Sequence, residues 1–163
     1  MRDGLRRVLI WEVIGAIFII VGGSLIHFLY EWSNHSQIVA IFSPINESLW
    51  EHHKLGLWSV ALFSLIEYWF IRDYINNFIT AKVAGILSLQ LLIVIGFYLY
   101  TSFIDRSILL LDILLYVIGA VICQVISYEV LTRKRVNRAI KYTAVLILIL
   151  HLALSVFFTY FRV

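Results

Sequence analysis

The chain of 163 residues contains one cysteine, one proline and one methionine, and only 14% of its residues are charged. A single cysteine excludes a disulfide framework and a thiolate metal cluster. Cys123 lies inside an apolar run, as is typical of a small packing residue. So little charge is not typical of a soluble globular protein. No patch combines basic with aromatic residues, so we predict no nucleic-acid partner.

Hydrophobic residues make up 62% of the chain and aromatic residues 15%. About 20 apolar residues suffice for a helix to cross a bilayer. The sequence therefore predicts an all-α integral membrane protein, with one domain over residues 1–163 and the lipid bilayer as its surroundings. We expect five transmembrane helices, at about residues 5–30, 44–71, 83–103, 108–131 and 142–161. The first run is longer than the apolar region of a signal peptide, so we expect it to be a retained helix.

Basic residues set the expected orientation in the membrane. They gather at the N-terminus, between the second and third runs, and between the fourth and fifth runs. The positive-inside rule then places the N-terminus inside and the C-terminus outside. Residues 37–42 are too short to span, which predicts an interfacial or re-entrant segment before the second helix.

The densest polar stretch covers residues 43–56 and reads S-P-I-N-E-S-L-W-E-H-H-K-L-G. Proline is tolerated in the first turn of a helix, and serine is a common N-cap. We therefore expect the second helix to begin near Pro44 with Ser43 as its cap. On that helix Glu47, Glu51 and Lys54 would share one stripe, where a metal ion, a shared proton or Lys54 could offset the two carboxylates. A simpler alternative is that these acidic residues only stabilise the helix N-terminus.

The expected orientation divides the polar side chains between the two membrane faces. We expect one group at the outer face: His27, Glu31, Asn46, Glu47, Ser48, Glu51, His52, His53, Asp105 and Asp112. Glu12, Glu67 and Glu129 lie toward the other face, where we expect ion pairs with neighbouring arginines at the interface. For His151, in the middle of the last run, we expect a hydrogen bond to a serine or tyrosine of another helix.

Three segments carry a resemblance to a known family. They are H-F-L-Y-E-W at 27–32, P-I-N-E-S-L-W-E-H at 44–52 and I-E-Y at 66–68. They resemble small bacterial integral membrane proteins classed as a domain of unknown function, with the motif P-[VI]-N-E-S-[VL]-W-E-H. The resemblance implies a multi-pass protein of the bacterial cytoplasmic membrane and implies no activity. By position it points to His27, Glu31, Asn46, Glu47, Trp50, Glu51, His52 and Glu67, while His53 occupies a usually aliphatic position.

Imidazoles and carboxylates together suit Zn²⁺, Mn²⁺ or Fe²⁺. Neither H-E-x-x-H nor H-x-x-E-H occurs in the chain. The hypothesis for a metal site therefore depends on residues of the first two helices meeting in space. The predicted ligands are His27, Glu31, Glu51 and His52.

Three functions remain open at this point. One is a metal-dependent hydrolase or transferase that acts on a lipid-linked or small-molecule substrate, with Glu47, Glu51 and His52 as catalytic residues. Another is a cation- or proton-coupled transporter, with Glu67 and His151 deeper along the path. The third is a non-catalytic membrane partner or assembly subunit bound to another protein. Further candidate site residues are Asn46, Ser48, Trp50, His53 and Glu67.

Overall fold

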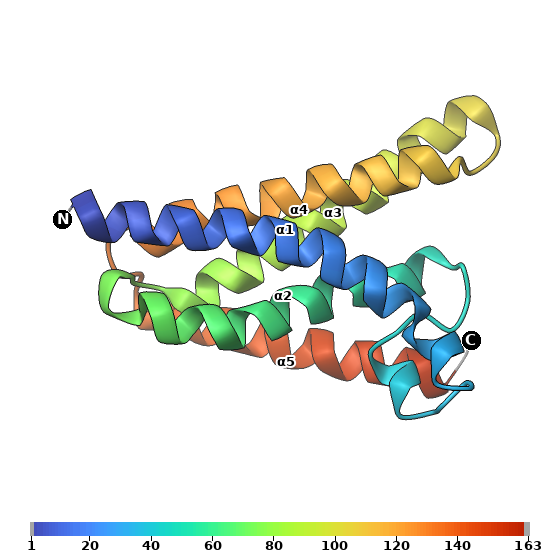
Figure 1. The fold of residues 1–163 in the computed structure, drawn as a ribbon, viewed down its shortest axis with the longest axis horizontal. Helices are drawn as coiled ribbons and strands as arrows, with labels where there is room; N and C mark the ends of the chain where they lie inside the picture. The colour runs from blue at the N-terminus through green and yellow to red at the C-terminus, as the bar shows by residue number, and fades with distance from the viewer. Residues whose placement is uncertain (1, 162–163) are drawn as a thin grey trace.

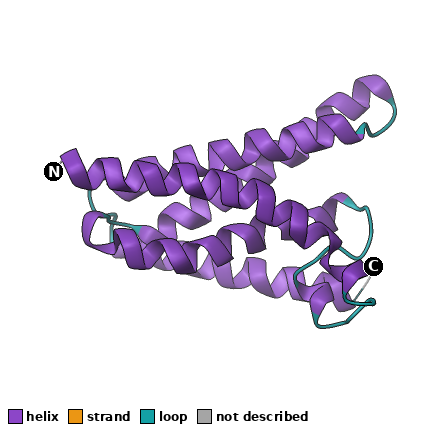
Figure 2. Cartoon of the chain, viewed as in Figure 1, coloured by secondary structure: helices purple, strands orange, loops and turns teal. Residues whose placement is uncertain are grey.

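A computed structural model describes residues 2–161 and shows an all-helical bundle in which these residues form no strand (Figures 1 and 2). Each of the five long helices is long and apolar enough to cross a membrane, as the sequence predicts. Two short 3₁₀ helices, η1 and η2, lie in the connections on either side of α2. In chain order the elements are α1 (Arg2–Trp32), η1 (Val39–Ile41), α2 (Leu49–Ile71), η2 (Arg72–Tyr74), α3 (Phe78–Ile104), α4 (Leu109–Thr132) and α5 (Arg138–Tyr160).

The expected start of the second helix is wrong by five residues. Helix α2 begins at Leu49, because the hydroxyl of Ser48 accepts a hydrogen bond from the backbone N–H of Glu51 and caps the helix. Ser43, the expected cap, is used in a contact with α1 instead. Residues 44–48 are therefore an irregular connection with bends at 45–47, and Glu47 precedes the helix rather than sharing its surface.

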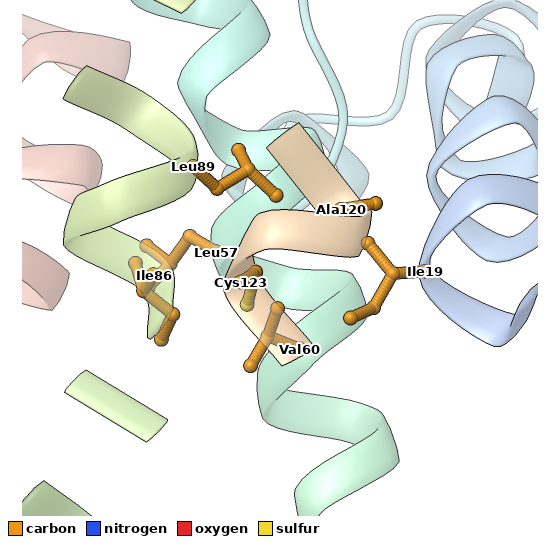
Figure 3. Close-up of a cluster of buried hydrophobic side chains, with 7 residues drawn as sticks. All are labelled: Ile19, Leu57, Val60, Ile86, Leu89, Ala120 and Cys123. Atoms are coloured by element: carbon orange, nitrogen blue, oxygen red, sulfur yellow. The ribbon is translucent and has the colours of Figure 1, made fainter. Parts of the chain in front are cut away.

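The centre of the bundle is an apolar cluster to which four helices contribute (Figure 3). Its buried members are Ile19, Leu57, Val60, Ile86, Leu89, Ala120 and Cys123. Close packing of such side chains stabilises membrane helix contacts through van der Waals interactions. The thiol of Cys123 is fully buried, in agreement with the packing role that the sequence predicts.

Helices α3 and α4 form a hairpin that leaves the bundle at one end. The buried residues of α3 lie between Ala81 and Gln90, and those of α4 lie between Gly119 and Leu131. Residues 91–104 and 109–118 contribute no buried side chain. Figure 1 shows this tip pointing away from the ends of α1, α2 and α5. The polar residues at the ends of α1, α2 and α5 therefore lie together without any contribution from the α3–α4 hairpin.

Candidate functional site

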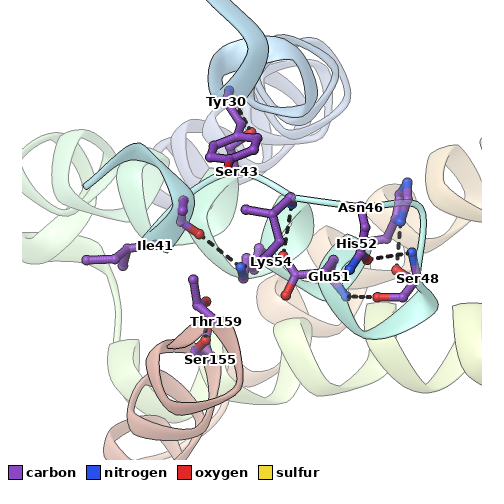
Figure 4. Close-up of polar contacts among 12 residues, drawn as sticks. Tyr30, Ile41, Ser43, Asn46, Ser48, Glu51, His52, Lys54, Ser155 and Thr159 are labelled. Carbon is purple, nitrogen blue, oxygen red and sulfur yellow. Dashed lines mark hydrogen bonds and ion pairs between the residues drawn. The ribbon is translucent and has the colours of Figure 1, made fainter. Parts of the chain in front are cut away.

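The connection between α1 and α2 is fastened to α1 by Ser43. The hydroxyl of this fully buried residue donates to the carbonyl oxygen of Ile26 at 2.6 Å and accepts from the N–H of Tyr30 at 3.1 Å. These two backbone groups are four residues apart, the spacing at which groups pair in a regular α-helix. Ser43 therefore ties the connection to the last turns of α1, as Figure 4 shows beside Tyr30.

A buried ion pair fastens the same connection to α2. Lys54 Nζ lies 2.6 Å from Glu51 Oε2, and the two side chains are 1% and 4% exposed. Lys54 also donates to the carbonyl of Ala40 at 2.9 Å, and Glu51 Oε2 accepts from the N–H of Ile45 at 3.0 Å. Figure 4 shows this pair between the connection and the α5 residues Ser155 and Thr159. The expected cation for Glu51 is therefore Lys54.

The segment held in this way brings three metal-binding side chains together. His27 from the end of α1 and His52 from the first turn of α2 place their Nε2 atoms 3.2 Å apart. Glu47 Oε2 lies 3.4 Å from His52 Nε2 and 3.9 Å from His27 Nε2. One possible ligand atom from each residue thus falls within 4.8 Å of the others.

The hydrogen bond of the His52 ring fixes which nitrogen is free to bind. Its Nδ1 lies 2.9 Å from the carbonyl oxygen of Ser48. A carbonyl can only accept, so Nδ1 carries the proton and Nε2 keeps its lone pair in the neutral ring. A backbone carbonyl that orients an imidazole in this way is the usual support of a metal-ligating histidine. His52 Nε2 is therefore directed at His27 and Glu47 in a form suited to metal binding.

The distances fit a single tetrahedral ion. Ligand atoms at about 2.0–2.1 Å from Zn²⁺ and at tetrahedral angles are about 3.3 Å apart. The separations of 3.2 and 3.4 Å agree with this value, and that of 3.9 Å is longer. The Glu47 side chain is 83% exposed, so its carboxylate has room to move inward. Two imidazoles and one carboxylate leave the fourth position to water or substrate.

Other predicted site residues lie around the cluster and not in it. Glu31 is exposed at the end of α1, outside the group of three. Asn46 Oδ1 accepts from the N–H of Ser48 at 3.0 Å and so shapes the turn before α2. The ring of Trp50 stacks on that of His53, with centroids 5.8 Å apart.

His53 Nδ1 donates to the carbonyl of Leu49 at 2.7 Å, within its own helix. Asp112, expected on the same face of the membrane as the cluster, hydrogen-bonds Tyr100 at 2.5 Å. Both Asp112 and Tyr100 belong to the α3–α4 hairpin, which leaves the bundle there.

Of the three glutamates expected to form ion pairs with neighbouring arginines, one does so. Glu129 pairs with Arg133 at 3.5 Å on the surface. For Glu12 and Glu67 the expectation is wrong, since Lys82 Nζ lies 3.0 Å from Glu12 Oε1 and 2.5 Å from Glu67 Oε2 inside the bundle. The expected third helix begins at about residue 83 and leaves Lys82 in the connection before it, whereas α3 begins at Phe78 and includes Lys82.

The expected partner of His151 is also wrong. Its Nε2 lies 2.9 Å from the Nε2 of Gln90 on α3, so the hydrogen-bond partner is an amide and not a hydroxyl group. Gln90 is an amide side chain inside an apolar run, so its position within a membrane helix is the signal that could have identified it.

Comparisons with known proteins agree with the resemblance seen in the motif. No curated protein and no solved structure matches the chain. One family model matches residues 3–162, nearly the whole chain, and its description is a family of unknown function. This protein is therefore a member of that family, DUF6512.

Proposed function

We propose that His27, Glu47 and His52 bind one divalent transition metal ion, with Zn²⁺ as the best fit, and that the protein is a membrane metalloenzyme. The observation that carries the proposal is the convergence of three ligand atoms from α1, α2 and their connection. A Zn²⁺ ion held by three protein groups lowers the pKa of a bound water to about 7 and so supplies a nucleophile. The reaction class is hydrolysis or group transfer.

The position of the cluster suggests a substrate at the membrane surface. The cluster lies at the ends of two helices that are long enough to span, and the exposed Trp32 is the last residue of α1 at the same end. Tryptophan at a helix end is typical of the headgroup layer. The basic residues gather at the opposite ends of these helices, which supports an orientation with the N-terminus inside and the site at the outer face of the cytoplasmic membrane. A lipid-linked substrate is the one that such a site meets.

Each acidic residue of the region has a separate task in this proposal. Glu47 is a metal ligand. Glu51 is a positioning residue, because its Oε2 holds both Lys54 and the backbone of Ile45. Glu31, four residues after His27 on the same face of α1, supplies an exposed carboxylate for proton transfer.

Metal binding is the first test. Protein purified in detergent and stripped with a chelator is titrated with Zn²⁺ in a calorimeter, and we expect one ion per chain. His27→Ala and His52→Ala should each weaken binding by about 100-fold or more, since changes in groups that only support a ligand already cost 10–100-fold. The matched control is His35→Asn, which removes an exposed imidazole at the same end and keeps a residue that tolerates the positive φ of this position. Equal affinity in wild type and both alanine variants would show that the cluster binds no metal.

Turnover is the second test. Proteoliposomes that contain ester- and phosphoester-linked lipids are assayed for released headgroup or acyl chain. We expect release that stops on chelation, returns with Zn²⁺ and is lost in Glu47→Gln. Stoichiometric zinc without any release would instead indicate a structural metal in a non-catalytic partner subunit, and ion flux across the liposome membrane would indicate a transporter.

A further inference from the structure

Three charged side chains meet inside the bundle, each from a different helix. Glu12 of α1 and Glu67 of α2 are 3% and 0% exposed, and Lys82 of α3 is 6% exposed. The ammonium of Lys82 contacts one oxygen of each carboxylate, at 3.0 Å and 2.5 Å. Helix α4 adds Ser127, whose hydroxyl donates to Glu12 Oε1 at 2.8 Å. We refer to Glu12, Glu67 and Lys82 as the buried triad.

The charges of the buried triad do not balance. Two carboxylates share one ammonium, so with all three groups ionised one negative charge remains in the interior. The second oxygens, Glu12 Oε2 and Glu67 Oε1, are buried and have no hydrogen-bond partner among residues 2–161. An ionised carboxylate that is removed from water and given no donor is far less stable than its protonated form.

Among the described residues, no second cation contacts the buried triad to balance its remaining negative charge. On one side lies the apolar cluster of Val8, Ile71, Ala81 and Leu131. The ring of Phe78 lies 5.5 Å from Lys82 Nζ. Helix α4 contributes the neutral groups of Ser127 and Gln124, and the thiol of Cys123 lies within electrostatic reach. Within the described part of the chain, Lys82 is the one cation paired with either carboxylate.

We propose that the buried triad is an intramembrane proton-binding site that holds one proton, shared between Glu12 and Glu67. Binding converts one carboxylate to a carboxylic acid and leaves one carboxylate to pair with Lys82, so the triad becomes neutral. A metal cation in this place would need several oxygen ligands, and only Glu12 Oε2 and Glu67 Oε1 have neither a hydrogen bond nor the contact with Lys82. Because the two carboxylates contact the same ammonium, the proton belongs to the pair and not to either residue.

Infrared spectroscopy tests this directly, because a protonated carboxyl has a C=O stretch distinct from that of a carboxylate. At pH 7 we expect Glu67→Gln and Glu12→Gln each to remove the same protonated-carboxyl band, since either change leaves one carboxylate paired with Lys82. Lys82→Met removes the cation, and both carboxyls should then be protonated, doubling the band. Glu129→Gln is the matched control, because this exposed carboxylate pairs with Arg133 and should leave the band unchanged.

The outcomes separate the proposal from its alternatives. An unchanged band in both glutamine variants would mean that both carboxylates are ionised in the wild type, which overturns the proposal. Loss of the wild-type band on addition of Na⁺ at fixed pH would also overturn it, since a metal cation would then occupy the site. Glutamine matches glutamate in shape, and a single symmetric peak in size-exclusion chromatography shows that each variant is folded. Zn²⁺ titration of the same variants should match wild type, so this test is independent of the metal site.

Discussion

Removal of one member of the Glu51–Lys54 pair should destabilise the protein far more than removal of both. The two side chains are 4% and 1% exposed, so water screens their charges very little. Loss of one partner from a buried ion pair costs about 3–5 kcal/mol, because the remaining charge stays buried. We therefore expect Glu51→Gln and Lys54→Met each to lower the free energy of unfolding by about that amount.

The double variant Glu51→Gln/Lys54→Met contains neither charge and should lose much less stability than the two single changes together. Denaturant unfolding in detergent micelles gives the three free energies, and a double-mutant cycle isolates the interaction between the two side chains. We expect an interaction of roughly 3 kcal/mol. Single variants within about 0.5 kcal/mol of wild type, or a double variant that equals their sum, would refute the reasoning.

The single variant Glu51→Gln also distinguishes two roles for Glu51. The sequence predicts Glu51 as a metal ligand, whereas in the structure its Oε2 holds Lys54 and the N–H of Ile45. An amide oxygen in Glu51→Gln can still accept from Ile45, so the connection that places Glu47 is kept. We expect Zn²⁺ affinity within about tenfold of wild type, less than the loss from removing a true ligand.

Two further predictions concern the α3–α4 hairpin. A Cβ added at Gly85 would lie 2.9 Å from the backbone oxygen of Cys123, so Gly85→Ala should lower stability by about 1–3 kcal/mol in the same unfolding assay. Gly22→Ala is its control, since the nearest atom is a Phe18 ring carbon 3.4 Å away on the same helix, and it should change stability little. Asp112→Asn should leave Zn²⁺ binding unchanged in calorimetric titration, and a clear loss of binding would place the hairpin at the metal site.

Hydropathy predicts the five helices well because the number of residues needed to cross a bilayer is fixed by its thickness. The start of α2 is harder, since two serines precede it. Ser43, with Pro44 after it, is the better cap by local rules. In the structure, however, the hydroxyl of Ser43 is hydrogen-bonded to α1, and Ser48 caps the helix. Local preference fails here because a contact between helices decides which serine is free.

The candidate site is predicted only in part for a similar reason. The sequence predicts that His27, His52 and Glu47 lie in one polar region. It also predicts that Glu47 shares a helical stripe with Glu51 and Lys54, and this part is wrong because Glu47 precedes the helix. In the structure Glu47 lies before the helix and meets the two histidines, while Glu51 turns to Lys54. Likewise Lys82 contacts Glu12, which lies 70 residues earlier in the chain, and no local pattern of spacing reveals this contact.

The outer halves of α3 and α4 have a consequence for the protein in its natural setting. Residues 91–104 and 109–118 bury no side chain fully within the chain, although Ile93 and Tyr116 pack against the central cluster. In a bilayer the exposed side chains of this tip would meet acyl chains, so its surroundings would depend on the composition of the lipid. The buried triad and the central apolar cluster, by contrast, are enclosed by protein and keep the same neighbours in any bilayer.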